Sequence, residues 1–394
     1  MTTLELLGFG PRQTPSRIVF SAPGLRLRCY GAGTRRHPPL LIVPAPIKRC
    51  YVWHLAPGHS VVRQALARGV GVYLIEWTEL PARAGMPGLA DYAGPLIDAC
   101  VKVIQRRNAC VQVALFGHAL GGVLAALHSA WRPGHVAALA LFEAPINVDG
   151  LAPLVRLVTG TALLASLPSE RGRPLPGSLL SAIFANAAPA AFYAGPAIDV
   201  VASAPFPGLL ATHLRVRRWT LDKLPMSRAL FDDALALLFA HNSFMHGDLV
   251  LNGTRLDPGQ VRAPLLSLYR PLSALVPPGA VLGFHEAAGS AHKVLLPYLG
   301  DVGVALQHVG ALVGAGAHQL VWPRVFDWLE RLGPLSTARA PVARSARLRD
   351  AGRRGGTWPG RHDRRPGRAS RCRRHRHARA GSKPRPRSCG APRP

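Results

Sequence analysis

The 394-residue sequence lacks the features that mark several classes of protein. Its six cysteines form no CxxC pair and no tight framework, which excludes the disulfide scaffold of small secreted domains and favours reduced thiols. No uninterrupted apolar stretch reaches the roughly 20 residues that a membrane helix needs. The N-terminus has no long apolar region behind a basic start, so it does not resemble a secretory signal. We therefore expect a cytoplasmic protein without a transmembrane segment.

Acidic residues are also scarce. The chain has 48 Lys and Arg against 20 Asp and Glu, for a formal net charge of +28. The excess is uneven, since residues 336–394 contain 19 Lys and Arg and two acids, which leaves +11 for residues 1–335. The body of the chain is therefore only moderately basic. The location of the charge says more about binding partners than the net charge of the whole chain does.

Residues 336–394 consist mostly of Arg, Pro, Gly, Ser and His, too few apolar groups to offset the entropy of ordering, so we predict a disordered tail. It is either a basic arm for polyanions, acting through counterion release, or incidental, such as the product of an altered reading frame. No aromatic or helical pattern accompanies the arginines beyond Trp358, which favours the incidental interpretation over a nucleic-acid partner. We expect no metal site or cofactor in so basic a segment. The side chains there that could bind a metal are Cys372, His375, His377 and Cys389.

Short apolar runs alternate with helix-like segments in the first 150 residues, which favours a mostly parallel sheet with helices on both faces. An opening hairpin is expected at residues 17–20 and 25–30. The further expected strands are 40–43, 70–77, 111–116 and 136–143, with helices at 59–68 and 89–106. Later in the chain we expect strands at 264–269 and 293–299 and a closing helix at 322–332.

The segment "VALFGHALGGVLAAL", residues 113–127, has an apolar run, a glycine-rich turn and an Ala- and Leu-rich stretch. This is typical of the strand, sharp turn and helix that carry the catalytic serine of α/β-hydrolases in a G-x-S-x-G pattern. Gly117, Gly121 and Gly122 meet the steric demand of such a turn. Alone, the pattern could be a tight strand–helix turn with a packing role, but its place after several strand–helix units favours the hydrolase interpretation.

Residues 151–250 differ from the alternating part, because they are rich in Ala, Leu and Pro and contain one clear helix at about 228–241 but no convincing strand. An insertion of this kind after the elbow and the next strand is expected to be a helical cap over the active site. The predicted organisation is therefore a core in two parts with a cap and a tail. The boundaries are 1–150 and 251–335 for the core, 151–250 for the cap and 336–394 for the tail.

Three further blocks make the chain resemble the polyhydroxyalkanoate synthases and their α/β-hydrolase relatives. They are "PPLLIVPAPIKRCYVWHLAPGHSVVRQALARGVGVYLIEW", "RAPLLSLYRPLSALVPP" and "GDVGVALQHVGALVG". The resemblance covers roughly residues 38–332, with the cap only loosely matched and the tail unmatched. The first and third blocks are specific to the family, whereas the elbow alone is not.

The resemblance implies the site residues. In that family a cysteine, or in the relatives a serine, attacks a thioester or ester carbonyl, a histidine takes the proton and an aspartate orients the histidine. Carried over position by position, the base is His308, but Ala119 stands at the nucleophile position. The aspartate belongs among residues 270–273, where this chain has Arg-Pro-Leu-Ser, so Ser273 stands near the acid position. The backbone N–H groups of Ile47 and Leu120 would form the oxyanion hole.

Other residues offer weaker alternatives. Glu143, at the end of the strand after the elbow helix, and Asp301, seven residues before His308, could each orient the histidine, but we prefer to interpret them as a strand-end and a loop acid. His118, the variable position of the elbow, is a substrate-binding candidate that we expect to be a packing residue. Trp53 and His54 are candidates to line the pocket, and no metal partners are evident for them.

The sequence thus predicts an α/β-hydrolase fold with a helical cap. The leading hypothesis for its function is that the protein binds an acyl-CoA or hydroxyacyl ester ligand. On this hypothesis it descends from an acyltransferase or hydrolase and has lost covalent catalysis. Loss of a triad nucleophile costs about a millionfold in turnover, or roughly 8 kcal/mol of barrier. The alternative is a non-catalytic, granule-associated or subunit-like interaction protein that contacts polymer or a homologous synthase.

Overall fold

The computed structural model describes residues 3–31, 33–34, 36–81, 85–149, 173–273 and 275–333. All of them belong to the first of two compact units, Met1–Ala340. The tail predicted at 336–394, with its candidate metal ligands, lies outside the described residues, as do residue 150 and residues 151–172 of the predicted cap.

An eight-stranded sheet forms the centre of this unit, in the order β1-β2-β6-β3-β7-β8-β11-β12. The hairpin β1–β2 is antiparallel and pairs antiparallel with β6, and every other neighbouring pair is parallel. The predicted mostly parallel α/β sheet is therefore confirmed. The strands are β1 (Arg17–Ala22), β2 (Leu25–Gly31), β3 (Leu40–Val43), β6 (Val72–Trp77), β7 (Val113–His118), β8 (Val136–Phe142), β11 (Leu265–Tyr269) and β12 (Lys293–Pro297).

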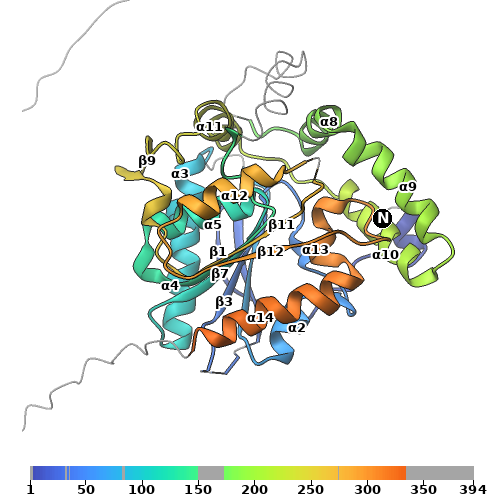
Figure 1. The fold of residues 1–394 in the computed structure, drawn as a ribbon, viewed down its shortest axis with the longest axis horizontal. Coiled ribbons are helices and arrows are strands. Elements are labelled where there is room, and N and C mark those ends of the chain that lie inside the picture. The colour runs from blue at the N-terminus through green and yellow to red at the C-terminus, as the bar shows by residue number, and fades with distance from the viewer. Residues whose placement is uncertain are drawn as a thin grey trace, which may run out of the picture. The chain divides into compact units, whose positions relative to one another are not determined.

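Helices cover both faces of the sheet, because the central strands are apolar at almost every position and so present apolar side chains on both faces. On β3, Leu41 and Val43 pack into one core cluster and Leu40 and Ile42 into the other, as the two-residue period of a strand requires. Each such fully buried leucine contributes roughly 2 kcal/mol through removal of apolar surface from water. In Figure 1, α4 and α5 lie on one side of the strands and α2 and α14 on the other. These helices are α2 (Val61–Ala67), α4 (Ile97–Asn108), α5 (Leu120–Trp131) and α14 (Trp322–Arg331).

Two predicted helices differ in detail from the structure. The helix predicted at 59–68 begins at Val61, because Ser60 is its N-cap and accepts a hydrogen bond from the Arg63 backbone N–H at 3.0 Å. The helix predicted at 89–106 is interrupted, since Gly94 has non-helical torsions (φ −96°, ψ −107°) directly before Pro95. A proline disfavours the helical conformation of the residue before it. The segment is therefore divided into α3 (Leu89–Asp91), η2 (Tyr92–Leu96) and α4.

Between β8 and β11 the described chain is mainly helical. We call this group the cap helices, and Figure 1 shows α8, α9 and α10 beside one another in yellow-green at one end of the unit. The helix predicted at 228–241 is present as α11 followed by η6. The cap helices are α8 (Gly177–Ala187), η5 (Ala190–Ala194), α9 (Gly195–Ser203), α10 (Pro207–Leu221), α11 (Arg228–Asp233) and η6 (Ala234–Ala240).

Two elements beyond the cap helices were not predicted. The short hairpin β9 (Leu249–Leu251) and β10 (Thr254–Leu256) turns at Asn252 and Gly253, both with positive φ. Helix α12 (Pro278–Ala287) follows β11 and packs Phe284 into the main core cluster. Across the described residues, no single helix is long and apolar enough to cross a membrane, and one bent pair, Gly177–Ala187 with Ala190–Ser203, meets the length and composition only across a 106° break.

Candidate active site

The elbow lies where β7 ends at His118 and α5 begins at Leu120. Between them Ala119 has φ 52° and ψ −130°, a conformation that costs free energy for any residue with a Cβ. Hydrogen bonds on both sides hold it there. The Ala119 N–H donates to the Phe142 carbonyl at 3.1 Å, and the Ala119 carbonyl accepts from Gly122 N–H at 2.9 Å. The strained turn that presents a nucleophile in hydrolases is thus formed around a methyl side chain.

Glycines make this turn possible because other backbone segments approach it closely. A Cβ on Gly121 would lie 2.2 Å from the Val43 carbonyl oxygen, and one on Gly117 would lie 2.5 Å from the Gly122 Cα. Val43 is the last residue of β3 and pairs with Gly117 in the sheet register. The elbow is therefore packed directly against the loop that follows β3, which carries Ile47.

His308 lies in the short 3-10 helix Gln307–Val309 and directs Nδ1 towards Glu143 Oε2 at 3.4 Å. Glu143 directly follows β8, has a positive φ of 44° and is fully buried. The same Oε2 accepts a hydrogen bond from Ser273 Oγ at 3.1 Å, and Ser273 Oγ accepts one from the Val276 N–H at 3.1 Å. Of the candidate acids, Glu143 is thus the one in contact with His308, from a strand different from the one that the family pattern implies.

Asp301 lies in a different environment. Its carboxylate accepts hydrogen bonds from the Tyr298 hydroxyl at 2.8 Å and from the N–H groups of Gly316 and Ala317 at 2.9 Å each. These bonds join the loop after β12 to the turn before the last helix. In the described part of the chain they account for Asp301 as a loop-organising acid, without a hydrogen bond to His308.

His118 packs against His308, with ring centroids 4.5 Å apart, and its Nε2 lies 2.8 Å from the His308 carbonyl oxygen. Burial, with a smaller effect of His308, lowers the pKa of His118 to about 3, so that it is neutral at physiological pH. Its Nε2–H therefore donates to the carbonyl and holds the backbone of the base position. Trp53 lines the cavity described below, whereas His54 is turned to Tyr30 and lies outside its lining.

A cavity of about 330 Å³ lies over the elbow, a size within the range of small-molecule sites. Ala119, Leu120, Ile47 and His308 all line it. The structure therefore brings the predicted nucleophile, base and oxyanion positions to one space. The cap helices supply most of the opposite wall, through apolar side chains that include Leu180, Ile183, Phe184, Leu235 and Phe239.

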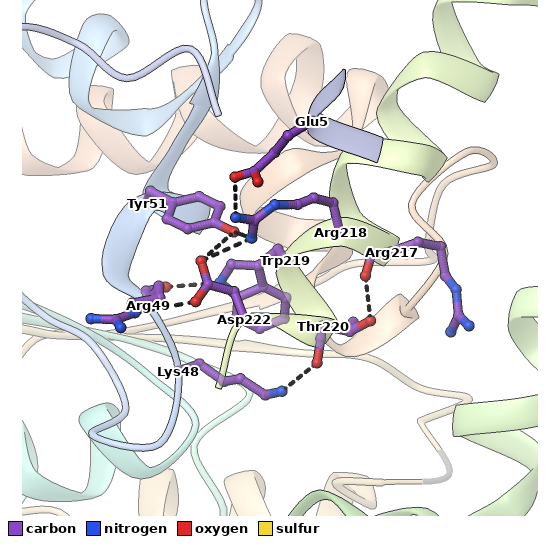
Figure 2. Close-up of polar contacts among 9 residues, drawn as sticks. All are labelled: Glu5, Lys48, Arg49, Tyr51, Arg217, Arg218, Trp219, Thr220 and Asp222. Atoms are coloured by element: carbon purple, nitrogen blue, oxygen red, sulfur yellow. Dashed lines mark hydrogen bonds and ion pairs between the residues drawn. The ribbon is translucent and has the colours of Figure 1, made fainter. Parts of the chain in front are cut away.

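Helix α10 is fastened to the loop that carries Ile47 by a network of charged groups (Figure 2). Its centre is Asp222, which accepts hydrogen bonds from Arg49 at 3.2 Å, from the Tyr51 hydroxyl at 3.2 Å and from Arg218 at 2.8 Å. Arg218 also donates to Tyr51 at 2.8 Å and pairs with Glu5 near the N-terminus. We call these residues, with Lys48 and Trp219, the α10 clasp. Sequence reasoning missed it.

Lys48, next to Ile47, is the member of the clasp closest in sequence to the oxyanion position. Its Nζ donates to the Thr220 carbonyl at 2.8 Å and lies 5.6 Å from the centre of the Trp219 ring. Burial and the neighbouring charge of Lys223 lower the pKa of Lys48 to about 8, although Asp222 acts in the opposite direction. Lys48 and Lys223 both line the cavity, so its charged lining is basic at this side.

A second connection joins the cap helices to the loop before His308. Asp199 on α9 is buried and accepts hydrogen bonds from the N–H groups of Gly303 and Ala305 at 2.8 Å each, and from His213 Nδ1 at 2.6 Å. We call this group the Asp199 latch. Ala305 lines the cavity and has a φ of 55°, so the latch stabilises a strained residue three positions before the base.

The residues that the structure describes contain no group of three or more His, Cys, Asp or Glu side chains arranged to hold a metal ion. Cys29, Cys50 and Cys100 are buried free thiols, and burial raises the pKa of Cys50 to about 12.

Comparison with known proteins agrees with the predicted family. The chain is 26% identical over 341 residues to the poly(3-hydroxyalkanoate) polymerase subunit PhaC of Haloferax mediterranei, covering 86% of this chain and 68% of that one. It is also 26% identical over 320 residues to the PhaC subunit of Allochromatium vinosum, covering 80% and 88%. The chain is thus similar in sequence to these polymerase subunits over most of its length. No protein-family model matches it.

Solved structures similar to this chain include a monoacylglycerol lipase of Paleococcus ferrophilus, with a TM-score of 0.48, 14% identity and coverage of 78% of this chain and 99% of that one. Another is an enol-lactonase of Burkholderia xenovorans, with a TM-score of 0.47, 11% identity and coverage of 80% and 99%. The chain's own mostly parallel eight-stranded sheet, with helices on both faces and a strained turn after β7, confirms the α/β-hydrolase fold that the sequence predicted.

Proposed function

We propose that this polyhydroxyalkanoate synthase-like protein binds a hydroxyacyl thioester or ester, such as an acyl-CoA, in the cavity beneath the cap helices, and that it has lost covalent catalysis. The observation that carries the proposal is Ala119. Its backbone has the strained geometry of a nucleophile elbow, but its methyl group cannot attack a carbonyl. The apolar cavity over it, shared with His308, supports retention of a binding role.

The roles within the site follow from the same geometry. His308 occupies the base position, with Glu143 and Ser273 in place of the missing aspartate. The N–H groups of Leu120 and Ile47 serve as the oxyanion hole, which is built from backbone and does not depend on the lost side chains. Such a hole with its binding site preserves a residual effect of roughly a thousandfold after removal of a triad member.

The test is to measure binding and covalent chemistry separately. Isothermal titration with hydroxybutyryl-CoA should show saturable binding to the wild-type protein, and mass spectrometry of a quenched mixture should show no acyl adduct. Ala119→Cys and Ala119→Ser should each acquire an acyl adduct and thioesterase activity, with a gain of about a hundredfold or more where His308 is aligned. Absence of binding, or an acyl adduct on the wild-type protein, would contradict the proposal.

An interaction role is the second candidate, favoured by apolar side chains on the outer surface of the cap helices. Ile198 and Val201 on α9 are 70% and 73% exposed, and Phe206 nearby in sequence is 57% exposed. Exposed apolar groups of this kind are typical of contact surfaces. Co-sedimentation with polyhydroxyalkanoate granules that is lost in Ile198→Asp with Val201→Asp, and unchanged by Leu180→Trp in the cavity, would favour this role over ligand binding.

A further inference from the structure

The alanine at position 119 leaves space at the point where the family's reaction takes place. A serine or cysteine there would put its oxygen or sulfur between the base and the bound carbonyl. With a methyl group, that part of the cavity is open to a small molecule, and a water needs only about 10–15 Å³ of accessible space, far less than this cavity offers. His308 and the Leu120 N–H, both on the cavity lining, are polar partners for it.

The histidine is oriented to act on such a water. Its Nδ1 faces Glu143 Oε2, so the proton of a neutral ring lies on Nδ1 and Nε2 is the acceptor. Glu143 cannot turn away easily, because it is fully buried and its Oε2 is also held by Ser273. From the other side, His118 binds the His308 carbonyl oxygen and fixes the backbone. Base and orienting acid are therefore both in place without the nucleophile.

We propose that the protein slowly hydrolyses its bound acyl thioester by direct attack of water, with His308 as the general base and Glu143 as a positioning residue. This inference rests on the proposed binding function. The water oxygen forms a bond to the carbonyl carbon while His308 Nε2 takes one of its protons, and the N–H groups of Leu120 and Ile47 stabilise the oxyanion. The carbon–sulfur bond then breaks, and His308 returns the proton to the thiolate. The products are the free acid and the thiol.

The expected rate is low but measurable. General-base catalysis contributes typically 10²–10⁴-fold, and an oxyanion hole with a binding site retains about 10³-fold over water when the nucleophile is absent. Multiplying the lower general-base factor by the factor from the oxyanion hole, we expect turnover of the order of 10⁵ above the rate in buffer, without a burst and without an acyl adduct. Leu120, whose N–H would stabilise the oxyanion in this step, directly follows the strained Ala119 turn as the first residue of α5.

The experiment follows release of free thiol from hydroxybutyryl-CoA under single-turnover and steady-state conditions. His308→Ala should reduce the rate about a hundredfold, and Glu143→Gln about tenfold in kcat with KM unchanged, because the amide orients the imidazole but cannot stabilise its charged form. His246→Ala, a histidine outside the cavity lining, is the matched control and should leave the rate as it is. Binding of hydroxybutyryl-CoA is measured by titration for each variant.

The outcomes separate this inference from the proposed function. Binding with a wild-type rate equal to that in buffer, or with a rate unaffected by His308→Ala, overturns direct water attack and leaves the binding function in place. Failure to bind the thioester overturns the binding function itself. A Glu143→Gln variant with raised KM and unchanged kcat would remove Glu143 from its positioning role. Circular dichroism of His308→Ala checks that a lost rate does not reflect a lost fold.

Discussion

The two sides of the cavity are built in different ways. On the side of the sheet, the elbow, Glu143 and His308 lie at the ends of apolar strands, and backbone packing sets their geometry. On the side of the cap helices, the charged groups of the α10 clasp and the Asp199 latch set the geometry. Position 119 holds an alanine, yet the charged groups that join the cap helices to the rest of the unit are paired. The difference indicates that interactions independent of the side chain at position 119 keep the shape of the cavity, which mutation of each side can test.

The largest effect is expected from breaking the Asp199 latch. Asp199→Ala leaves two buried backbone N–H groups and the side chain of His213 without their acceptor, which should lower the free energy of unfolding by about 3 kcal/mol. Urea denaturation followed by tryptophan fluorescence measures it. Asp232→Ala is the matched control, because its pair with Arg228 is a half-exposed i,i+4 contact within one helix, and such pairs contribute about 0.5 kcal/mol. Equal losses in the two variants would contradict a special role for the latch.

The latch also predicts how this loss depends on pH. Burial alone would raise the pKa of Asp199, but hydrogen bonds from His213, Ala305 and Gly303 outweigh it and lower the pKa below its usual value. A lowered carboxyl pKa contributes stability above the unfolded value of about 4, and this contribution is lost as the pH falls through the folded pKa. The stability gap between wild type and Asp199→Asn should therefore be constant above about pH 5 and should shrink below pH 4.

A smaller effect is expected on the side of the sheet. Gly121→Ala puts a Cβ 2.2 Å from the Val43 carbonyl oxygen, so the elbow and the Ile47 loop must move apart, at a cost of about 2 kcal/mol. The same substitution at Gly208, in helix α10 with nothing within 4 Å, should be neutral or stabilising by up to about 1 kcal/mol. Thermal denaturation compares the two, and a stable Gly121→Ala protein would show that backbone packing does not set the elbow.

The smallest effect is expected from Lys48. Its pKa of about 8 lies below the unfolded value of about 10.4, so the unfolded chain binds more protons between these values and folding stability rises with pH across that window. Relative to Lys48→Met, the wild-type protein should gain about 1 kcal/mol between pH 7 and pH 10, after allowance for partial exposure. Denaturation curves at each pH measure the difference in free energy of unfolding between the two proteins. A difference that stays constant from pH 7 to pH 10 would mean that Lys48 is exposed to solvent.

The sequence predicted the sheet well because its signals are local. The apolar run 40–43 coincides with β3, and the runs predicted at 264–269 and 293–299 match β11 and β12 within one or two residues. Two local signals were present but not used. Asn252-Gly253 is typical of a two-residue hairpin turn, and Gly94-Pro95 indicates a break in the helix predicted at 89–106.

The candidate site was harder to predict where it depends on distant partners. Glu143 and His308 are 165 positions apart, and Asp222 lies 171 positions from Tyr51, so their pairing follows from the fold and not from any local pattern. The family pattern pointed to residues 270–273 for the acid, and the structure shows Ser273 there, hydrogen-bonded to Glu143 from the neighbouring strand end. The sequence offers Glu143 as an acid at the end of a strand, but that position alone does not distinguish an acid that orients His308 from an ordinary strand-end carboxylate.

The elbow holds a residue with φ 52° even though its side chain has no chemical use for that pose. Strain of this kind persists only where the surroundings leave no other conformation, and here they are the glycines and the hydrogen bonds to Phe142 and Gly122. The side chain at position 119 and the turn that presents it are therefore separable: one substitution changes the first, while the second is spread over three strands and a helix. A substitution at position 119 alone would place a new side chain in a turn that is already formed.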